Sequence, residues 1–235
     1  MSFASFDFII FLVTYFILIS LFKNKWKSVT ILFSIFFYSY WNILLCLLLI
    51  FTTLHTFIIG NLISKNKKFA KNYLILGLIL SLSVLFIFKY FDFFVSDLVN
   101  INLDGTIFAK IILPIGISFY TFQSMSYIID IYKKKTEPTT LENLFVFICF
   151  FPQLVAGPIV RASNFIPQIK RGLDINLNNI KKGLLLIMWG YFLKLCISNN
   201  LDAYVNTVYN YIDESNHFYY YSEDLNLWQK LINES

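Results

Sequence analysis

Residues Val29 to Ile63 form a run of 35 residues without a charged side chain, and this run limits the possible folds more than any other feature. A single α-helix of that length would reach about 52 Å. The hydrocarbon core of a bilayer is about 30 Å thick, so the run must bend, tilt strongly or split. Trp41-Asn42 is its only obvious polar interruption. Because lysine clusters flank the run on both sides, the sequence predicts a hairpin of two short membrane helices.

The composition also indicates a membrane protein. Of the 235 residues, 57% are hydrophobic and 14% are charged, whereas soluble domains carry about 25% charged residues. No linker, repeat or soluble domain stands out, so we expect residues 1–235 to form one all-α, polytopic membrane domain. The amino-terminal MSFASFDF lacks the basic region of a signal peptide and is expected to begin a retained helix. Further apolar segments predict other spans: Phe6–Phe22, Tyr73–Phe88, Phe108–Tyr132 and Gly183–Ile197.

The distribution of charge predicts an orientation. The formal net charge is +5, but the lysines stand in short clusters between apolar segments. That pattern is typical of cytoplasmic loops in a membrane protein, not of a surface that binds nucleic acid. The charged residues of the segments Phe91–Ile107 and Ser198–Ser235 are almost all acidic, and these segments are expected outside. The sequence therefore predicts a multi-pass plasma-membrane protein in contact with the lipid bilayer, with its amino terminus outside and no nucleic-acid partner.

The segment FFPQLVAGPIVR, Phe150 to Arg161, is too irregular for a simple span. Proline has no backbone N–H and breaks a helix. Broken backbone at membrane depth is tolerated only inside protein or beside a water-filled cavity. Basic residues flank the surrounding run Leu144–Val160 on both sides, so the run either re-enters from the cytoplasmic face or forms a kinked span. The residues alone support the two equally.

In the re-entrant interpretation, this segment lines a pocket. Gln153 and the carbonyls freed by the broken helix are then available to a ligand. Arg161 closes the segment and is expected either to anchor an anionic group or to reach lipid phosphates.

A polar stripe marks the apolar segment that precedes these residues. Four polar residues there are spaced three, four and three positions apart: Tyr120, Gln123, Tyr127 and Asp130. This spacing places them on one face of a helix. Because unpaired polar groups are costly in lipid, the face is expected to turn inward, where it serves either helix packing or ligand contact. Asp130 is expected to be a helix-end carboxylate near Lys133, within reach of the membrane interface.

The histidines and cysteines do not form a catalytic or metal-binding pattern. His55 is expected to be a buried, hydrogen-bonded imidazole, and His217 to be solvated. Cys46, Cys149 and Cys196 lie far apart in apolar runs and are expected to be buried thiols. We therefore assign no residue as a catalytic base and none as a metal ligand.

Two of these stretches resemble a known family. LPIGISFYTFQSMSYIIDIYKKK (113–135) followed by FFPQLVAGPIVRASNFIPQI (150–169) resembles the membrane-bound O-acyltransferases. The similar branch is bacterial and contains the alginate and peptidoglycan O-acetyltransferases and the D-alanyl transfer protein of teichoic acid synthesis. The pattern P-Q-L-x-x-G-P-I-x-R, from Pro152 to Arg161, is quite specific. The resemblance covers essentially the whole chain but only about the first half of the family's length.

The resemblance implies a partial membrane-bound O-acyltransferase fold in a bacterial inner membrane. Such enzymes transfer an acyl group, in this branch usually acetyl, from a cytoplasmic thioester to a hydroxyl of an extracytoplasmic polysaccharide. The donor, acetyl-CoA or another acyl thioester, is a substrate, so no bound cofactor is implied. The resemblance assigns these residues to the lining of a substrate tunnel: Tyr120, Gln123, Tyr127, Gln153, Gly157, Pro158 and Arg161.

The family's general base is thought to be a buried histidine, and its histidine motifs lie in the second half of the family's length. Neither His55 nor His217 matches those motifs. We therefore expect a truncated chain, or one piece of a split enzyme, that is inactive alone and works with the missing carboxyl-terminal half or a periplasmic acetyltransferase partner. The alternatives are a non-catalytic membrane subunit or inactive remnant packed against a partner, and a transporter. Transporters also use broken helices but usually show repeats, which are not visible here.

Overall fold

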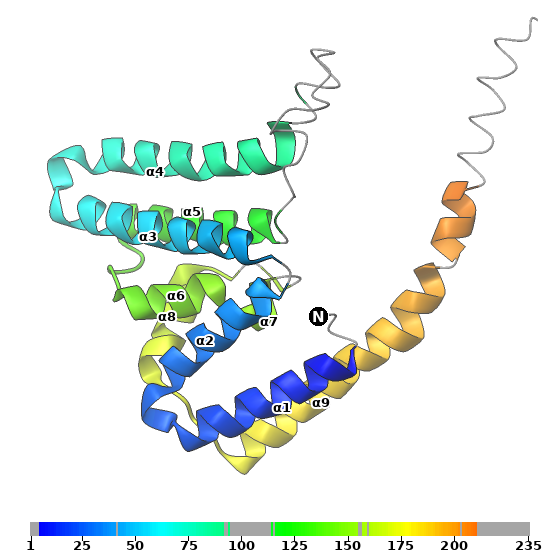
Figure 1. The fold of residues 1–235 in the computed structure, drawn as a ribbon. Coiled ribbons are helices and arrows are strands. Elements are labelled where there is room, and N and C mark those ends of the chain that lie inside the picture. Colours follow the sequence, from blue (N-terminus) through cyan, green and yellow to red (C-terminus); the bar gives the residue numbers. More distant parts are fainter. Residues whose placement is uncertain are drawn as a thin grey trace, which may run out of the picture. The chain divides into compact units, whose positions relative to one another are not determined.

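All the regular secondary structure of the described residues is helical, which confirms the predicted all-α class (Figure 1). The chain divides into two units, residues 1–173 and 174–235, and each is described by itself. The expectation of one membrane domain over the whole chain stays a prediction. The computed structural model describes residues 5–40, 42–91, 94, 114, 116–154, 157–158, 160–202 and 204–210.

Short helices follow one another closely in unit 1. In chain order they are α1 (Phe6–Leu21), η1 (Lys23–Lys25), α2 (Trp26–Ser39), α3 (Ile43–Lys65), η2 (Lys67–Phe69), α4 (Ala70–Leu85), η3 (Phe86–Tyr90), α5 (Ile117–Tyr132), α6 (Leu141–Cys149), α7 (Phe151–Leu154) and α8 (Ala162–Arg171).

The predicted break in the long uncharged run is confirmed. Helix α2 ends at Ser39 and α3 begins at Ile43, so the run is interrupted between these two residues; Trp41 lies outside the described residues. Two helical stretches among the described residues, Cys46–Lys65 and Lys67–Tyr90, are long and apolar enough to cross a membrane. Helices α1 and α2 meet at an angle of 108° and add a third crossing if the bent pair is one span. The protein is therefore an all-α membrane protein.

The predicted span Phe108–Tyr132 is described only in part. Its helix α5 begins at Ile117, and residues 108–113 and 115 lie outside the described residues. The 16 residues of α5 would extend over about 24 Å. Most of the acidic segment Phe91–Ile107 also lies outside the described residues.

Helices α3, α4 and α5 pack side by side (Figure 1), and the main core of unit 1 is formed by these helices together with α6 and α8. The helices approach closely at Gly60 on α3. A Cβ atom at that position would lie 2.9 Å from Tyr127 Cε1 and 2.9 Å from Ile131 Cδ1, both on α5. Small residues at such contacts are typical of helix packing in membranes, where dispersion contacts replace the hydrophobic effect.

A second, aromatic cluster joins α1 and α2 to the short helix α7. The ring of Phe151 lies 5.1 Å from the ring of Phe11 and 5.1 Å from that of Tyr15, in edge-to-face arrangements. Its centroid is also 5.8 Å from that of Phe37. Aromatic pairs at these distances and angles are favourable beyond their buried area. The cluster thus fixes the start of the broken segment against the first two helices.

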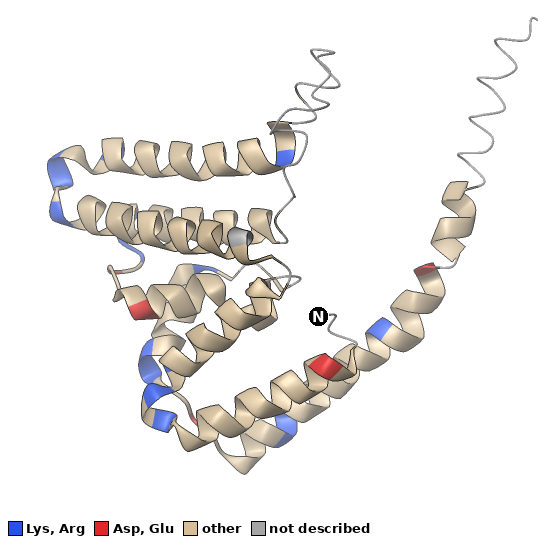
Figure 2. Ribbon diagram, viewed as in Figure 1, with Lys and Arg blue, Asp and Glu red and all other residues tan. Residues whose placement is uncertain are grey.

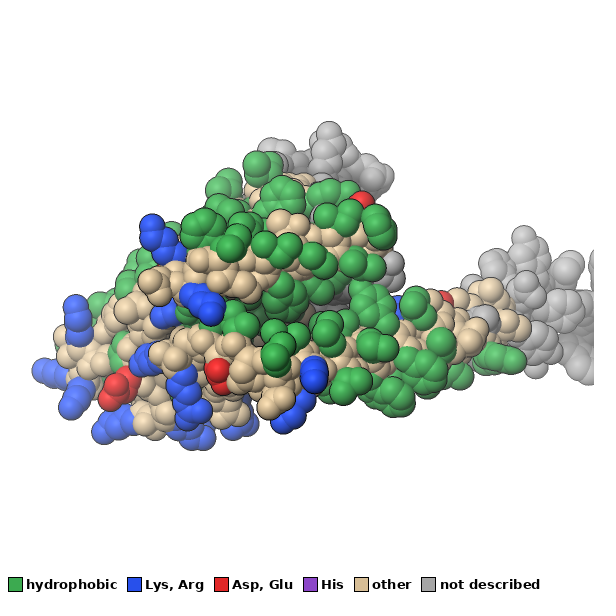
Figure 3. Space-filling model, turned by 90° about the horizontal axis from the view of Figure 1, so that it is seen from below, with side chains coloured by type: hydrophobic (Ala, Val, Ile, Leu, Met, Phe, Trp, Pro, Cys, Tyr) green, Lys and Arg blue, Asp and Glu red, His purple; other side chains and the backbone are tan. Residues whose placement is uncertain are grey.

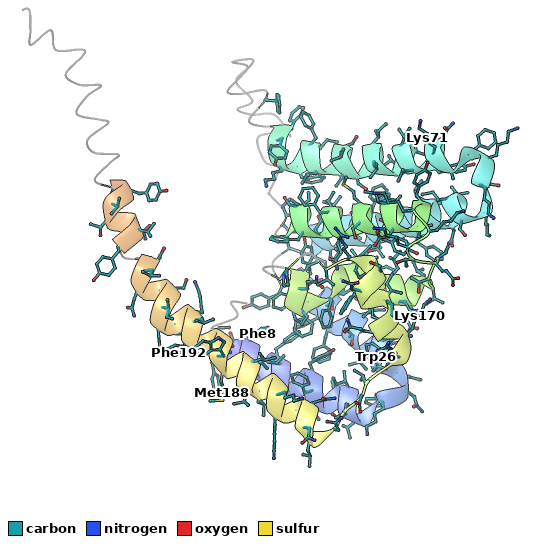
Figure 4. All side chains as sticks on the ribbon, turned by 180° about the vertical axis from the view of Figure 1, so that it is seen from behind. Phe8, Trp26, Lys71, Lys170, Met188 and Phe192 are labelled. Carbon is teal, nitrogen blue, oxygen red and sulfur yellow. The ribbon has the colours of Figure 1, made fainter. Side chains whose placement is uncertain are left out.

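The basic turns of unit 1 lie at the same end of the unit (Figure 2). They are the turn between α1 and α2, the turn between α3 and α4, the loop after α5 and the end of α8. Figure 3 shows the Lys and Arg side chains gathered at this end, with hydrophobic side chains away from it. Lys71 and Lys170 both lie there, whereas Phe8 lies toward the other end of α1 (Figure 4). We call this part of unit 1 the basic end.

Unit 2 contains α9 (Leu177–Phe192) and the π-helical turn η6 (Leu193–Ser198). The predicted span Gly183–Ile197 is helical, but it is not among the helices long and apolar enough to cross a membrane. Its apolar run between Lys182 and Lys194 is short, reaching about 17 Å. The prediction of a buried Cys196 is wrong, because no residue of α9 or η6 is buried and this thiol is exposed. Residues 211–235, with His217, lie outside the described residues.

Candidate functional site

The helix that enters the proline-containing segment stops at Cys149. Phe150 leaves the helical conformation, with φ −60° and ψ 106°. Pro152 has no N–H to donate to the carbonyl of Ile148, so a continuous helix would lose a hydrogen bond there. The segment therefore divides into α6, the four-residue α7 and α8. This confirms that the segment is broken near its prolines.

The break separates a donor and an acceptor that a continuous helix would pair. The N–H of Phe151 donates to Ser34 Oγ on α2, with an N···O distance of 3.2 Å. The carbonyl of Phe147, which would have accepted that N–H, accepts Gln123 Nε2 from α5 at 2.8 Å. Ser34 and Gln123 are 1% and 4% exposed, so water does not take their place. Two helices thus satisfy the broken backbone, as apolar surroundings require.

Gln123 also reaches the second glutamine of the site. Its Nε2 lies 3.5 Å from Gln153 Oε1. Gln153 in turn donates from its own Nε2 to the carbonyl of Pro158 at 2.6 Å. The two side-chain amides therefore connect α5 to the far side of the turn that follows α7.

Glycine is required where this turn folds back. The N–H of Gly157 donates to the carbonyl of Gln153 at 3.0 Å. A Cβ atom at Gly157 would lie 2.6 Å from Gln153 Cα, which is closer than real contacts allow. The motif residues Gln153, Gly157 and Pro158 therefore form one tight unit. Residues 155, 156 and 159 lie outside the described residues.

The start of α5 contacts the same turn. Gly116 is the N-cap of α5 and has φ 75°, in the left-handed region that favours glycine. A Cβ atom there would lie 2.2 Å from the carbonyl oxygen of Leu154. The backbone of α7 therefore rests directly on the start of α5.

The polar stripe of α5 faces inward, as predicted. Tyr127 accepts a hydrogen bond from the N–H of Thr139 at 3.2 Å, just before the N-cap of α6. Tyr120 is fully buried, and its phenol interacts with that of Tyr38. No hydrogen bond of good geometry to the Tyr120 hydroxyl is found among the described residues. The stripe thus serves packing, which was one of the two predicted uses, and ligand contact stays a prediction.

Asp130 lies in the last turn of α5, which confirms the predicted helix-end carboxylate near Lys133, and its reach to the membrane interface stays a prediction. The residue is 6% exposed. Its Oδ2 accepts the N–H of Ser163, in the first turn of α8, at 3.4 Å. The packing of α8 against α5 covers the carboxylate. Arg161 is the N-cap residue of α8 and is exposed.

The structure gathers most of the residues assigned to the tunnel lining. Tyr120, Gln123 and Tyr127 share the inner face of α5, and Gln123 joins this face to the turn formed by Gln153, Gly157 and Pro158. Arg161 stands apart at the start of α8. We call the turn and the α5 face together the amide site. A cavity of about 820 Å³ lies instead between α1 and α2, and none of these residues lines it.

Sequence reasoning missed two residues. Ser34 and Asp130 hold the backbone of the broken segment, but neither was assigned a role there. Both are polar side chains within apolar stretches. Such a side chain needs a partner inside the protein, and this requirement could have identified them from the sequence.

His55 is confirmed as a buried, hydrogen-bonded histidine. Its Nε2 lies 3.1 Å from Ser81 Oγ, so the ring links α3 to α4. Cys46 and Cys149 are confirmed as buried thiols. Among the described residues, no group of three or more His, Cys, Asp or Glu side chains could hold a metal ion.

Comparison with known proteins identifies related sequences. The chain is 33% identical over 217 residues to a peptidoglycan O-acetyltransferase of Helicobacter pylori, covering 79% of this chain and 41% of that protein. It is 35% identical over 178 residues to a probable alginate O-acetylase AlgI of Pseudomonas aeruginosa, covering 72% of this chain and 34% of that protein. A probable AlgI of Azotobacter vinelandii is 34% identical over 176 residues, covering 72% of this chain and 35% of that protein.

The chain thus matches about a third to two fifths of the length of these relatives. No family model matches the sequence, and no solved structure matches significantly. About a third of the aligned positions are nevertheless identical, and the alignments cover 72–79% of this chain. The chain belongs to the family of membrane-bound O-acyltransferases.

Proposed function

We propose that this chain is part of a membrane O-acetyltransferase that modifies a cell-surface polysaccharide. The observation that carries this proposal is its identity to proteins named peptidoglycan O-acetyltransferase and alginate O-acetylase. The acetyl donor is a thioester such as acetyl-CoA, bound from the cytoplasm at the basic end. The acceptor is a hydroxyl group of a polysaccharide outside the inner membrane, in which the protein is a multi-pass component.

In the proposed reaction the acceptor oxygen attacks the carbonyl carbon of the acetyl thioester. A C–O bond forms as the C–S bond breaks, and the proton of the hydroxyl ends on the released thiol. In the family a buried histidine is thought to remove this proton. Neither His55 nor His217 is assigned this role, so we expect the chain to need the remaining part of the enzyme or a partner protein.

The amide site supplies a wall of the substrate path in this proposal. Gln153 is only half-buried, although its side chain already bonds Gln123 and Pro158. A turn held by hydrogen bonds is suited to orienting a substrate, because small displacements of reacting groups cost much of the rate.

Chimeric enzymes test the proposal directly. The segments of the P. aeruginosa AlgI and of the H. pylori enzyme that align with this chain are replaced by the chain's own residues. We expect at least one chimera to acetylate its polymer, measured as ester-linked acetate on alginate or peptidoglycan. Two chimeras that reach the membrane at parental levels but add no acetate would contradict the proposal and favour a non-catalytic subunit.

A matched pair of variants then tests the site. Gln153→Ala in the active chimera is expected to reduce acetylation by about tenfold, because the turn loses its internal bond. Gln168→Ala is the control, since Gln168 is exposed and bonds only within α8, to the carbonyl of Asn164 at 3.0 Å. Equal activity of the two variants would show that Gln153 does not contribute to the substrate site.

A further inference from the structure

Helix α8 begins without a cap from its own sequence. Its N-cap residue is Arg161, whose side chain makes no capping hydrogen bond. The first N–H groups of any helix lack partners within the helix. An aspartate, asparagine or serine at the N-cap usually accepts one of them. An arginine has only donors and cannot do so.

Asp130 supplies the missing acceptor from another helix. Ser163 is the second residue of α8, which is one of the positions that a capping side chain normally serves. Its N–H donates to Asp130 Oδ2 at 3.4 Å. The negative charge of the carboxylate also lies at the end of α8 where the helix dipole favours an anion.

The backbone of Asp130 is also hydrogen-bonded, to the loop that follows α5. Its backbone carbonyl accepts the N–H groups of Lys135 at 2.8 Å and Thr136 at 3.4 Å, which closes the end of α5. Lys134 has φ 56° in this turn. The same residue therefore joins α8 to the loop Lys133–Lys135, which belongs to the basic end.

We propose that Asp130 is a positioning residue for Arg161. By capping α8 from α5, it fixes the first turn of α8 and with it the backbone of the exposed N-cap residue Arg161. An arginine offers a planar set of donors that suits a phosphate group. In the enzyme proposed above, on which this assignment of a ligand rests, that phosphate belongs to the thioester donor.

Hydrogen exchange of the purified chain in lipid nanodiscs tests the capping role without any activity. Asp130→Leu is expected to speed exchange of the amides at 162–165 by about tenfold, which is the effect of losing one cap. Asp130→Asn keeps an acceptor oxygen but loses the charge and is expected to give a smaller increase, of about threefold. Glu137→Gln is the control, because this exposed carboxylate lies in the neighbouring loop.

Exchange of the amides of α3 reports whether a variant is folded. If Asp130→Leu loses protection there, Asp130→Asn alone decides the outcome. Unchanged exchange at 162–165 in the folded variant, within twofold of Glu137→Gln, overturns the proposal.

The role of Arg161 is tested by measuring the KM and kcat of variants of the active chimera. Asp130→Asn and Arg161→Gln are both expected to raise the KM for the thioester donor about tenfold while kcat changes by less than about twofold. The same measurements in neutral and in anionic nanodiscs show whether the phosphate belongs to the donor or to a lipid. If Arg161 binds a lipid headgroup, the variants change the KM only in anionic membranes. A loss of kcat at constant KM contradicts the positioning of Arg161. An inactive chimera with altered exchange contradicts only the proposed function.

Discussion

Gln123 Nε2 donates to the carbonyl of Phe147 at 2.8 Å, and this bond replaces one that the helix loses at its break. In a continuous helix the N–H of Phe151 would fill that position, but it donates to Ser34 instead. The amide site is therefore built on a backbone defect that two neighbouring helices satisfy.

Removing the Gln123 amide is expected to destabilise unit 1. Gln123→Leu leaves the buried carbonyl of Phe147 without a donor, which costs about 1–3 kcal/mol. Unfolding of the purified chain in mixed detergent micelles measures the change in free energy. Phe122→Leu is the matched control, since Phe122 is the neighbouring residue on α5 and is 43% exposed. A Gln123→Leu variant as stable as this control would show that another group satisfies the carbonyl.

Removing the Ser34 hydroxyl tests the other half of the break. Ser34→Ala leaves the N–H of Phe151 buried and unpaired, and a loss of about 1–3 kcal/mol is expected in the same unfolding assay. Ser20→Ala provides the comparison, because the Ser20 hydroxyl is exposed and bonds only within α1, to the carbonyl of Phe16. If both serine variants unfold alike, the contact from α2 does not support the segment.

Adding a methyl group at Gly116 is expected to displace the broken segment. The left-handed backbone at Gly116 disfavours alanine, and its Cβ would lie 2.2 Å from the carbonyl oxygen of Leu154. Gly116→Ala is therefore expected to cost at least about 1 kcal/mol. Gly183→Ala, where no described atom of unit 2 lies within 4 Å of the added Cβ, is expected to be neutral or to stabilise its helix. Thermal unfolding checks both, and a harmless Gly116→Ala would mean that α7 does not rest on α5.

The basic end is expected to face the cytoplasm. A cysteine introduced at Lys67 should react with an impermeant maleimide only in inverted vesicles, because basic loops stay inside. A cysteine introduced at Ser5, at the start of α1, should react in intact cells. The exposed Cys196 is first replaced by serine, whereas Cys46 and Cys149 are buried. Labelling of the Lys67 position from outside intact cells reverses the predicted orientation.

The sequence predicted the architecture well where polarity alone decides it. The missing charges from Val29 to Ile63 predicted the split between α2 and α3, and the prolines predicted the break after Cys149. The spacing of Gln123 and Tyr127 predicted an inward face because lipid excludes unpaired polar groups.

The details of the site depend on contacts between distant parts of the chain. Ser34 lies 117 positions before the N–H that it accepts, and Asp130 lies 33 positions before its partner. Spacing within one helix shows which face is polar, but it does not show which element that face meets. For the same reason, the sequence placed Asp130 at a helix end near Lys133 but did not show that α8 folds over it.

The order of residues along the chain has a consequence for how the protein is made. Ser34 and Gln123 both precede Phe147 and Phe151, which they bind. Because translation proceeds from the amino terminus, both supporting helices have already left the ribosome when the interrupted segment emerges. The segment can therefore fold against a prepared surface, and the peptide groups freed at its break find their partners as soon as they are synthesised.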